Sequence, residues 1–216
     1  MFYGSSFHIS ILHVHYFYSL SLVFFVSFSS SDTRLASSIA LSQVHIRNLT
    51  VNSPCCAGIC IGSEMSGGVE NIFVEDIVLQ NVGQGLRLKA GLGRGGFIRD
   101  VKFKNVQIKN AINWGIQVND YYGSHNKACH GRDKNAAPNV TGITFENVVA
   151  YGVGNGANFE GLHNAPVMNI LLKNVTLKTT GDVIYQCNVT DGRFDDNCQP
   201  TPICSNLTPL SFLDEH

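Results

Sequence analysis

The chain has 216 residues, which suits a single domain with a substantial hydrophobic core. Its formal net charge is −1 and its Lys and Arg residues are dispersed, which argues against a nucleic-acid-binding protein. Only 14% of the residues are charged and 21 are glycine, a composition typical of a turn-rich β protein.

The first feature along the chain is an apolar, aromatic stretch at residues 11–28, which overlaps a Ser-rich stretch at residues 27–38. The apolar stretch approaches the length of a membrane span or of a long signal-peptide core. No Lys or Arg precedes it, however, and two histidines interrupt it. We predict that residues 1–42 do not belong to the fold that follows, and we expect membrane contact only if residues 11–28 act as an anchor.

From residue 43 the chain repeats itself. Five segments of alternating apolar residues start 28, 29, 42 and 27 residues apart, and the alternation predicts a strand with one buried face in each. The segments are residues 44–51, 72–79, 101–108, 143–150 and 170–177. The longest interval holds a polar stretch, residues 123–138, which we interpret as one inserted loop.

A second short strand is predicted about 15 residues after each start, and each opens with a glycine that we attribute to a turn. The opening glycines are Gly58, Gly85, Gly115, Gly156 and Gly181. Two strands in about 28 residues are too few for a propeller blade, and the leucine frame of leucine-rich repeats is absent. The repeat therefore predicts an all-β fold, a parallel β-helix of about five coils at residues 43–206, followed by a tail at residues 207–216.

The fifth residue of every first strand is Asn or Asp, which predicts a ladder of side chains that bond from coil to coil in a turn. These residues are Asn48, Asp76, Asn105, Asn147 and Asn174. An inward-facing ladder would make Asn48 and Asn174 poor glycosylation sites, although both open a sequon. The predicted glycosylation sites are then Asn139, Asn188 and Asn206.

Aligning the second strands places Arg87 and Lys89 in two outward columns, about 7 Å apart along their strand. The neighbouring coils offer no carboxylate in the same columns. Two such cations favour an extended anionic ligand, because Arg can bind a carboxylate through two bonds and Lys adds a point charge. Tyr121 and Tyr122 end the next strand, and an aromatic ring beside the cations is suited to stack on a sugar ring. The alternative is a solvated strand face with a tyrosine at its end.

Three stretches in this region resemble the polygalacturonase-type pectinases of glycoside hydrolase family 28, in particular its plant branch. They are "GICIGSEMSGGVENI", "GLRLKAG" and "GIQVNDYYG", and a C-terminal cysteine pair accompanies them. The resemblance covers about residues 43–206 and corresponds to the C-terminal half of a family member, so we expect an N-terminally truncated chain. It implies a right-handed, single-stranded, pectin-lyase-like β-helix and inverting hydrolysis of α-1,4-galacturonide bonds. In that family, residues matching Arg87, Lys89 and Tyr122 bind the substrate.

The same resemblance identifies what this chain lacks. Inverting hydrolysis needs two carboxyl groups held well apart, which the family takes from an Asn-Thr-Asp motif and an Asp-Asp pair ahead of the stretch at residue 58. Here Asp32 is a lone acid, and Asp195 and Asp196 lie in the C-terminal region. The family's histidine aligns with Ala57. We therefore predict no catalytic residue and an inactive chain; the alternatives are a pectin-binding β-helix without activity and a non-functional truncated product.

The resemblance implies a disulfide between Cys187 and Cys204. It leaves five cysteines unassigned, namely Cys55, Cys56, Cys60, Cys129 and Cys198. The combination of seven cysteines with five sequons favours a secreted glycoprotein of the cell wall or extracellular space, and we expect a monomer that binds pectin or polygalacturonate. No cofactor is implied, and the histidines lack the spacing of a metal site.

Overall fold

The computed structural model describes residues 25–26, 40–62, 67–122 and 135–211, and these residues contain strands and no helix. The strands are β1 (Phe25–Val26), β2 (Ala40–Gly62), β3 (Gly68–Lys89), β4 (Phe97–Ala111), β5 (Trp114–Asn119), β6 (Asn139–Val153), β7 (Asn155–Glu160), β8 (Val167–Thr179), β9 (Tyr185–Asn188), β10 (Thr190–Phe194) and β11 (Leu207–Pro209). Asp32, His125, Cys129, His130 and most of the apolar stretch at residues 11–28 lie outside the described residues. The described part has no helix long and apolar enough to cross a membrane.

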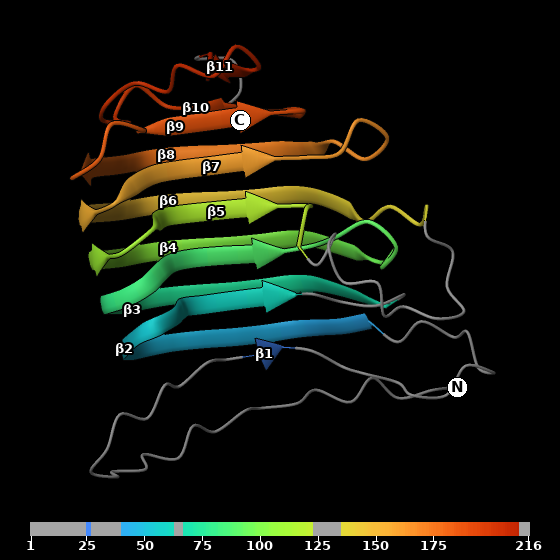
Figure 1. Ribbon diagram of the computed structural model, residues 1–216, viewed down its shortest axis with the longest axis horizontal. Coiled ribbons are helices and arrows are strands. Elements are labelled where there is room, and N and C mark those ends of the chain that lie inside the picture. The colour runs from blue at the N-terminus through green and yellow to red at the C-terminus, as the bar shows by residue number, and fades with distance from the viewer. Residues whose placement is uncertain (1–24, 27–39, 63–66, 123–134, 212–216) are drawn as a thin grey trace, which may run out of the picture.

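The strands stack as the coils of a right-handed parallel β-helix, which confirms the predicted fold (Figure 1). Each predicted first strand pairs in parallel and in register with the next, from Val44 with Ile72 through to Ile143 with Ile170. The long strands β2 and β3 each form one coil, and the pairs β4–β5, β6–β7 and β8–β9 form three more. Within the described residues the stack therefore has the five coils that the repeat predicts.

Asparagine and aspartate recur at the corners of the coils because the backbone there is left-handed. The predicted ladder position has φ between 51° and 55° in Asn48, Asp76, Asn105, Asn147 and Asn174. A second corner repeats the same conformation in Asn71, Asp100, Gly142 and Asn169. Among residues other than glycine, Asn and Asp tolerate this conformation best. The repeat of polar residues thus marks the bends that close each coil.

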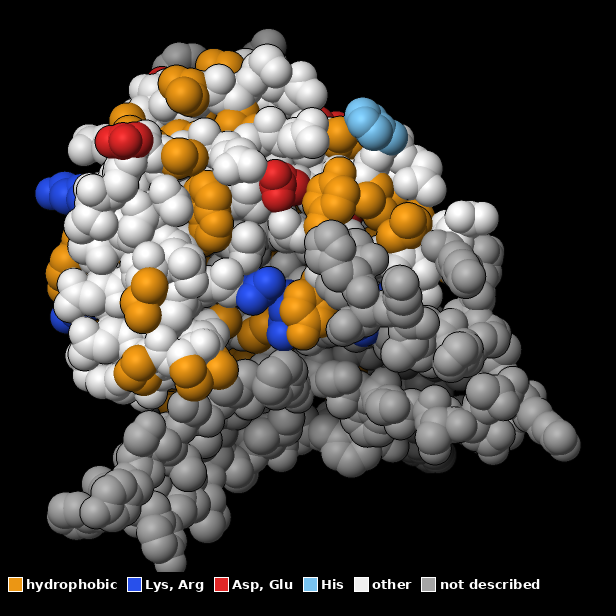
Figure 2. All heavy atoms as spheres, viewed as in Figure 1, with side chains coloured by type: hydrophobic (Ala, Val, Ile, Leu, Met, Phe, Trp, Pro, Cys, Tyr) orange, Lys and Arg blue, Asp and Glu red, His pale blue; other side chains and the backbone are white. Residues whose placement is uncertain are grey.

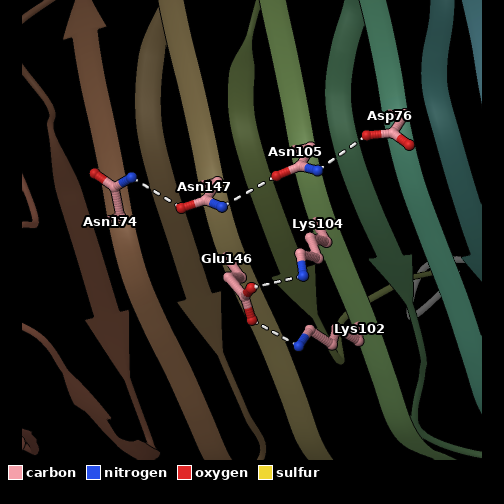
Figure 3. A network of polar contacts seen from close by, with 7 residues as sticks. All are labelled: Asp76, Lys102, Lys104, Asn105, Glu146, Asn147 and Asn174. Carbon is pink, nitrogen blue, oxygen red and sulfur yellow. Dashed lines mark hydrogen bonds and ion pairs between the residues drawn. The ribbon is translucent and has the colours of Figure 1, made fainter.

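The predicted ladder forms over four of its five residues, Asp76, Asn105, Asn147 and Asn174, but it lies on the outside of the helix (Figure 3). Asn174 donates to Asn147 at 2.8 Å, Asn147 to Asn105 at 3.0 Å, and Asn105 to Asp76 at 2.9 Å. The expectation of an inward ladder is wrong, because apolar columns such as Ile77, Val106, Val148 and Val175 already fill the interior. Burial in the core therefore gives no reason to exclude Asn48 or Asn174 from glycosylation.

The glycines that open the second strands are explained by close approach between coils and not by turn conformation. None of Gly85, Gly115 and Gly156 has a positive φ. A Cβ atom added to Gly85 would lie 2.2 Å from the carbonyl oxygen of Gly115, which is an impossible contact. The fifth of these strands also begins later than predicted, at Tyr185, because the chain bends at residues 180–182 and 184.

The C-terminal end of the described stack is tied down covalently. Strand β11 pairs in parallel with β10, directly after residue 206. A disulfide joins Cys187 in β9 to Cys204, with a Cα–Cα distance of 5.7 Å, which is ordinary for such a bond. The bond thereby joins β9 to the segment that precedes β11.

Candidate functional site

The candidate site lies on the sheet formed by the ends of β2 and β3 with β5, β7 and β9. The pairing has the predicted register. One column runs through Cys60, Arg87, Gln117, Asn158 and Gln186, and the other through Gly62, Lys89, Asn119, Glu160 and Asn188. The alternate residues, such as Leu86 and Leu88, are buried in the core. Alternation along each strand therefore directs both cations to the outer face.

Three cations surround the ring of Tyr122. Its centroid lies 4.5 Å from Nζ of Lys89, 5.5 Å from Cζ of Arg87 and 5.4 Å from Cζ of Arg94. The backbone of Tyr122 is fixed by a bond from its N–H to the carbonyl oxygen of Ala90 at 3.0 Å. Attraction between each cation and the ring adds on the order of 0.5–1 kcal/mol at exposed positions. The structure thus brings the three predicted binding residues together and adds Arg94.

The cations are more enclosed than the sequence suggests. Lys89 is only 6% exposed, Arg87 is half-buried, and Cys60 and Gln117 beside them are buried. Strands about 4.8 Å apart pack their outward side chains against one another, so an outward direction does not ensure contact with water. Arg87 Nη1 donates to Oε1 of Gln84 at 2.7 Å, whereas its buried Nε has no hydrogen-bond partner in the structure. That N–H is therefore a buried donor without a partner.

A network of neutral amides continues from Arg87 across the next coils. Gln84 donates to Gln117 at 3.0 Å, and Gln117 donates to Asn158 at 3.5 Å. In the adjacent column, Glu160 accepts bonds from Asn119 and Gln186, both at 2.8 Å. Glu160 lies two coils beyond Lys89 in the same column. The prediction that neighbouring coils offer no carboxylate in these columns is confirmed, and Glu160 lies one coil beyond the range that it covered.

Asp120 is a second carboxyl group that the sequence reasoning missed. It follows the buried Ile116 and Val118 in alternation, and its side chain is fully buried. Neither carboxyl oxygen has a hydrogen-bond partner in the structure. Burial raises the pKa of Asp120 to about 7. The signal was present in the sequence, because the alternation of the strand places this residue on the inward side.

The cysteines near the cations do not supply a nucleophile. Burial raises the pKa of the Cys60 thiol, and this effect outweighs the lowering influence of Lys89 and Arg87. The thiol of Cys60 is therefore neutral at neutral pH. Cys55 and Cys56 form no disulfide, and their sulfur atoms lie 3.0 Å apart. Ala57, at the predicted histidine position, is buried.

The remaining predicted residues lie elsewhere. Asp195 accepts bonds from the backbone N–H groups of Asn174 and Asn197, so it stabilises a turn. Asn139, Asn188 and Asn206 are exposed, as a glycosylation site must be. The described residues include no group of three or more His, Cys, Asp or Glu that could hold a metal ion.

A polar depression lies over other strands, away from Arg87, Lys89 and Tyr122. It is an open groove of about 690 Å³ on β6, β8, β10 and β11, lined by residues that include Thr144, Arg193 and Thr208. The neighbouring face carries ion pairs from Lys102 and Lys104 to Glu146 (Figure 3). Alternating charges of this kind are typical of a solvated surface. The sheet with Tyr122 is therefore the stronger candidate for a ligand site.

Known proteins resemble this chain in both sequence and structure. Residues 33–198 match the family described as Glycosyl hydrolases family 28. The chain is 36% identical over 176 residues to a probable polygalacturonase of Vitis vinifera, which covers 80% of this chain and 35% of that protein. It is 26% identical over 174 residues to a polygalacturonase of Chamaecyparis obtusa, covering 75% of this chain and 32% of that protein.

A solved structure shares the fold. It is the crystal structure of a hyperthermoactive exopolygalacturonase from Thermotoga maritima, which superposes with a TM-score of 0.62 at 25% sequence identity. The match covers 76% of this chain and 33% of that chain. The chain therefore spans about a third of the length of the relatives that it matches.

Proposed function

Because the chain belongs to glycosyl hydrolase family 28, we propose that it binds the galacturonate backbone of pectin at Arg87, Lys89 and Tyr122. The observation that carries the proposal is the cluster of cations around one aromatic ring on an outward sheet face. A galacturonate unit has an anionic carboxylate and an apolar ring face, and this cluster offers a partner for each.

Each of the three side chains has a separate part in binding. The half-buried guanidinium of Arg87 carries five N–H donors, and its bond to Gln84 uses one of them, so Arg87 is suited to meet a carboxylate. The ammonium group of Lys89 adds a point charge. The Tyr122 ring, held against both cations, is placed to contact the sugar ring. Enclosure of Lys89 strengthens its attraction to an anion, because the local dielectric is lower than in water.

The family's reaction, inverting hydrolysis of α-1,4-galacturonide bonds, requires an acid and a base separated by about 6.5–9.5 Å. The described carboxyl groups nearest the cations in the strand register are Asp120 and Glu160. Asp120 is buried, and both oxygens of Glu160 already accept amide hydrogen bonds, so the two do not form an exposed pair of acid and base. We therefore expect this chain alone to bind pectin without cleaving it. The alternative is hydrolysis, which would release new reducing ends from polygalacturonate.

Extracellular action at the cell wall is part of the same proposal. Its supports are the disulfide between Cys187 and Cys204 and the exposed sequon residues Asn139, Asn188 and Asn206. We expect a monomer. If the protein is secreted, removal of N-linked glycans should lower its apparent mass on a denaturing gel, whereas an unchanged mass would argue against glycosylation.

Binding is tested with the double variant Arg87→Ala and Lys89→Ala. Polygalacturonate affinity should fall by about 100-fold or more, because two charge-assisted hydrogen bonds of about 1.5–3 kcal/mol each are lost. Binding of the unaltered protein should also weaken as salt is added. The measurement is calorimetric titration with oligogalacturonides, accompanied by a reducing-end assay.

A matched control is the double variant Lys102→Ala and Lys104→Ala, which removes two cations from a different strand and face. Its affinity should equal that of the unaltered protein. If both double variants bind equally well, the site is not at Arg87 and Lys89.

A further inference from the structure

The column that contains Lys89 also contains a fixed negative charge. Lys89, Asn119 and Glu160 are consecutive partners on β3, β5 and β7. Two strand spacings separate Lys89 from Glu160, which is about 10 Å. Figure 2 shows Lys and Arg side chains on this face and an acidic side chain further along the stack. The face therefore has a cationic position and an anionic position along the helix axis.

Glu160 is held in place by its neighbours. Asn119 Nδ2 donates to Oε2 and Gln186 Nε2 donates to Oε1, both at 2.8 Å. Both donors are neutral amides, and Glu160 takes part in none of the ion pairs formed by the described residues. The amides orient the carboxylate without cancelling its charge. A ligand that lies over β7 thus meets a negative charge on a side chain whose orientation is fixed by two hydrogen bonds.

A long ligand that follows the columns passes over both positions. A carboxylate on the ligand is attracted by Arg87 and Lys89 and repelled by the like charge of Glu160. The repulsion is stronger when the bound ligand excludes water from Glu160. A neutral group at the second position avoids that repulsion. Repulsive elements of this kind decide between related ligands.

We propose that Glu160 makes the face selective for partly methyl-esterified pectin. One galacturonate unit with a free carboxylate binds at Arg87, Lys89 and Tyr122, and the unit over Glu160 is a methyl ester. This inference rests on the proposed pectin binding. It adds that the bound pectin carries a free carboxylate at one position and a neutral ester at the other. Asn119, between the two positions, is neutral and donates to Glu160, so it imposes no charge of its own.

The experiment compares two sets of oligogalacturonides of equal length, one fully de-esterified and one partly methyl-esterified, in calorimetric titrations. The unaltered protein should bind the partly esterified set at least fivefold more tightly. Glu160→Gln should bind the de-esterified set at least fivefold more tightly than the unaltered protein does. Its affinity for the partly esterified set should stay unchanged, so the preference disappears.

Two further variants test whether the effect comes from the charge of Glu160. Glu160→Ala should give the same gain as Glu160→Gln, which separates the effect of charge from that of a rearranged amide network. Glu75→Gln, in which the altered residue bonds to His45 on another face, should keep the original preference. Thermal unfolding of each variant checks that it is folded.

The outcomes separate the two proposals. If the unaltered protein binds neither set, the proposed function fails. If it binds both sets equally and the Glu160 variants change nothing, pectin binding stands and the role of Glu160 is overturned. If the Glu160 variants weaken binding to both sets, Glu160 is an acceptor for sugar hydroxyl groups and the selectivity proposal is also overturned.

Discussion

At the scale of single residues, Asp120 is the least expected group in the molecule. It follows Ile116 and Val118 on the inward-facing side of the same segment, and its carboxyl oxygens have no hydrogen-bond partner in the structure. Removing a carboxylate from water without a partner is costly, so the neutral acid is favoured and the pKa rises to about 7. Asp120 lies two residues before Tyr122, so this buried acid is close in sequence to the candidate site.

Asp120→Asn should abolish a pH dependence of stability. The folded protein holds the proton up to about pH 7, whereas an unfolded Asp releases it near pH 4. The folded state therefore binds more protons between these values, and the stability contributed by this group is lost as pH rises from about 4 to 7. The variant should be more stable than the unaltered protein above pH 7, by up to about 4 kcal/mol. Urea unfolding from pH 4 to pH 8 measures this, and parallel curves for the two proteins would contradict it.

At the scale of elements, the corner ladder connects the coils. Asn105 has a left-handed backbone, with φ of 53°, and its side-chain amide forms two hydrogen bonds. It donates one to Asp76 and accepts one from Asn147. These two properties act on the same residue but have different physical origins. Glycine preserves the first and removes the second, while alanine loses both.

Asn105→Ala should therefore destabilise the protein by about 2–5 kcal/mol, since it adds left-handed strain of roughly 1–2 kcal/mol to the loss of two hydrogen bonds worth about 0.5–1.5 kcal/mol each. Asn105→Gly should cost less, because it avoids the strain. Gln107→Ala, at an exposed position on the same strand, is the control and should change little. Chemical unfolding ranks the three variants, and an alanine variant as stable as the glycine variant would show that backbone strain is absent.

The sequence predicted the strands and their register because alternation and repeat length depend only on local residues. It did not predict why Gly85 is glycine, since the requirement comes from a carbonyl oxygen of the next coil. It placed the ladder inward, because strict alternation from Ile72 and Val74 makes Asp76 an inward residue. The left-handed bend at Asp76 instead shifts the next buried positions to Ile77 and Leu79. Similarly, the sequence identified Arg87 and Lys89 but not Arg94, whose contact with Tyr122 depends on how the turn after β3 folds back.

At the scale of the whole molecule, the coils form a nearly one-dimensional stack in which each coil contacts mainly its neighbours. Local stability should then differ along the stack, and an end coil opens more readily than an internal coil. The disulfide between Cys187 and Cys204 closes 17 residues at the C-terminal end. The disulfide therefore stabilises an end coil, which has a neighbouring coil on one side only.

The double variant Cys187→Ser and Cys204→Ser should lose about 3 kcal/mol of stability, as expected for a loop of this length. Hydrogen exchange should locate the loss in β9, β10 and β11, while the amides of β3 and β4 keep their protection. Cys55→Ser, which alters an exposed cysteine outside any disulfide, is the control. Uniform loss of protection along the chain would show that the stack unfolds as a single unit.

The pairing between β4 and β6 stays in register, although their equivalent starts are 42 residues apart instead of about 28. The chain leaves β5 at Asn119, beside the candidate site, and enters β6 at Asn139. One coil can thus accept a long insertion without any change in the coils around it. Evolution can therefore vary the sequence next to the site by lengthening one connection, while the framework that positions Arg87 and Lys89 is inherited unchanged.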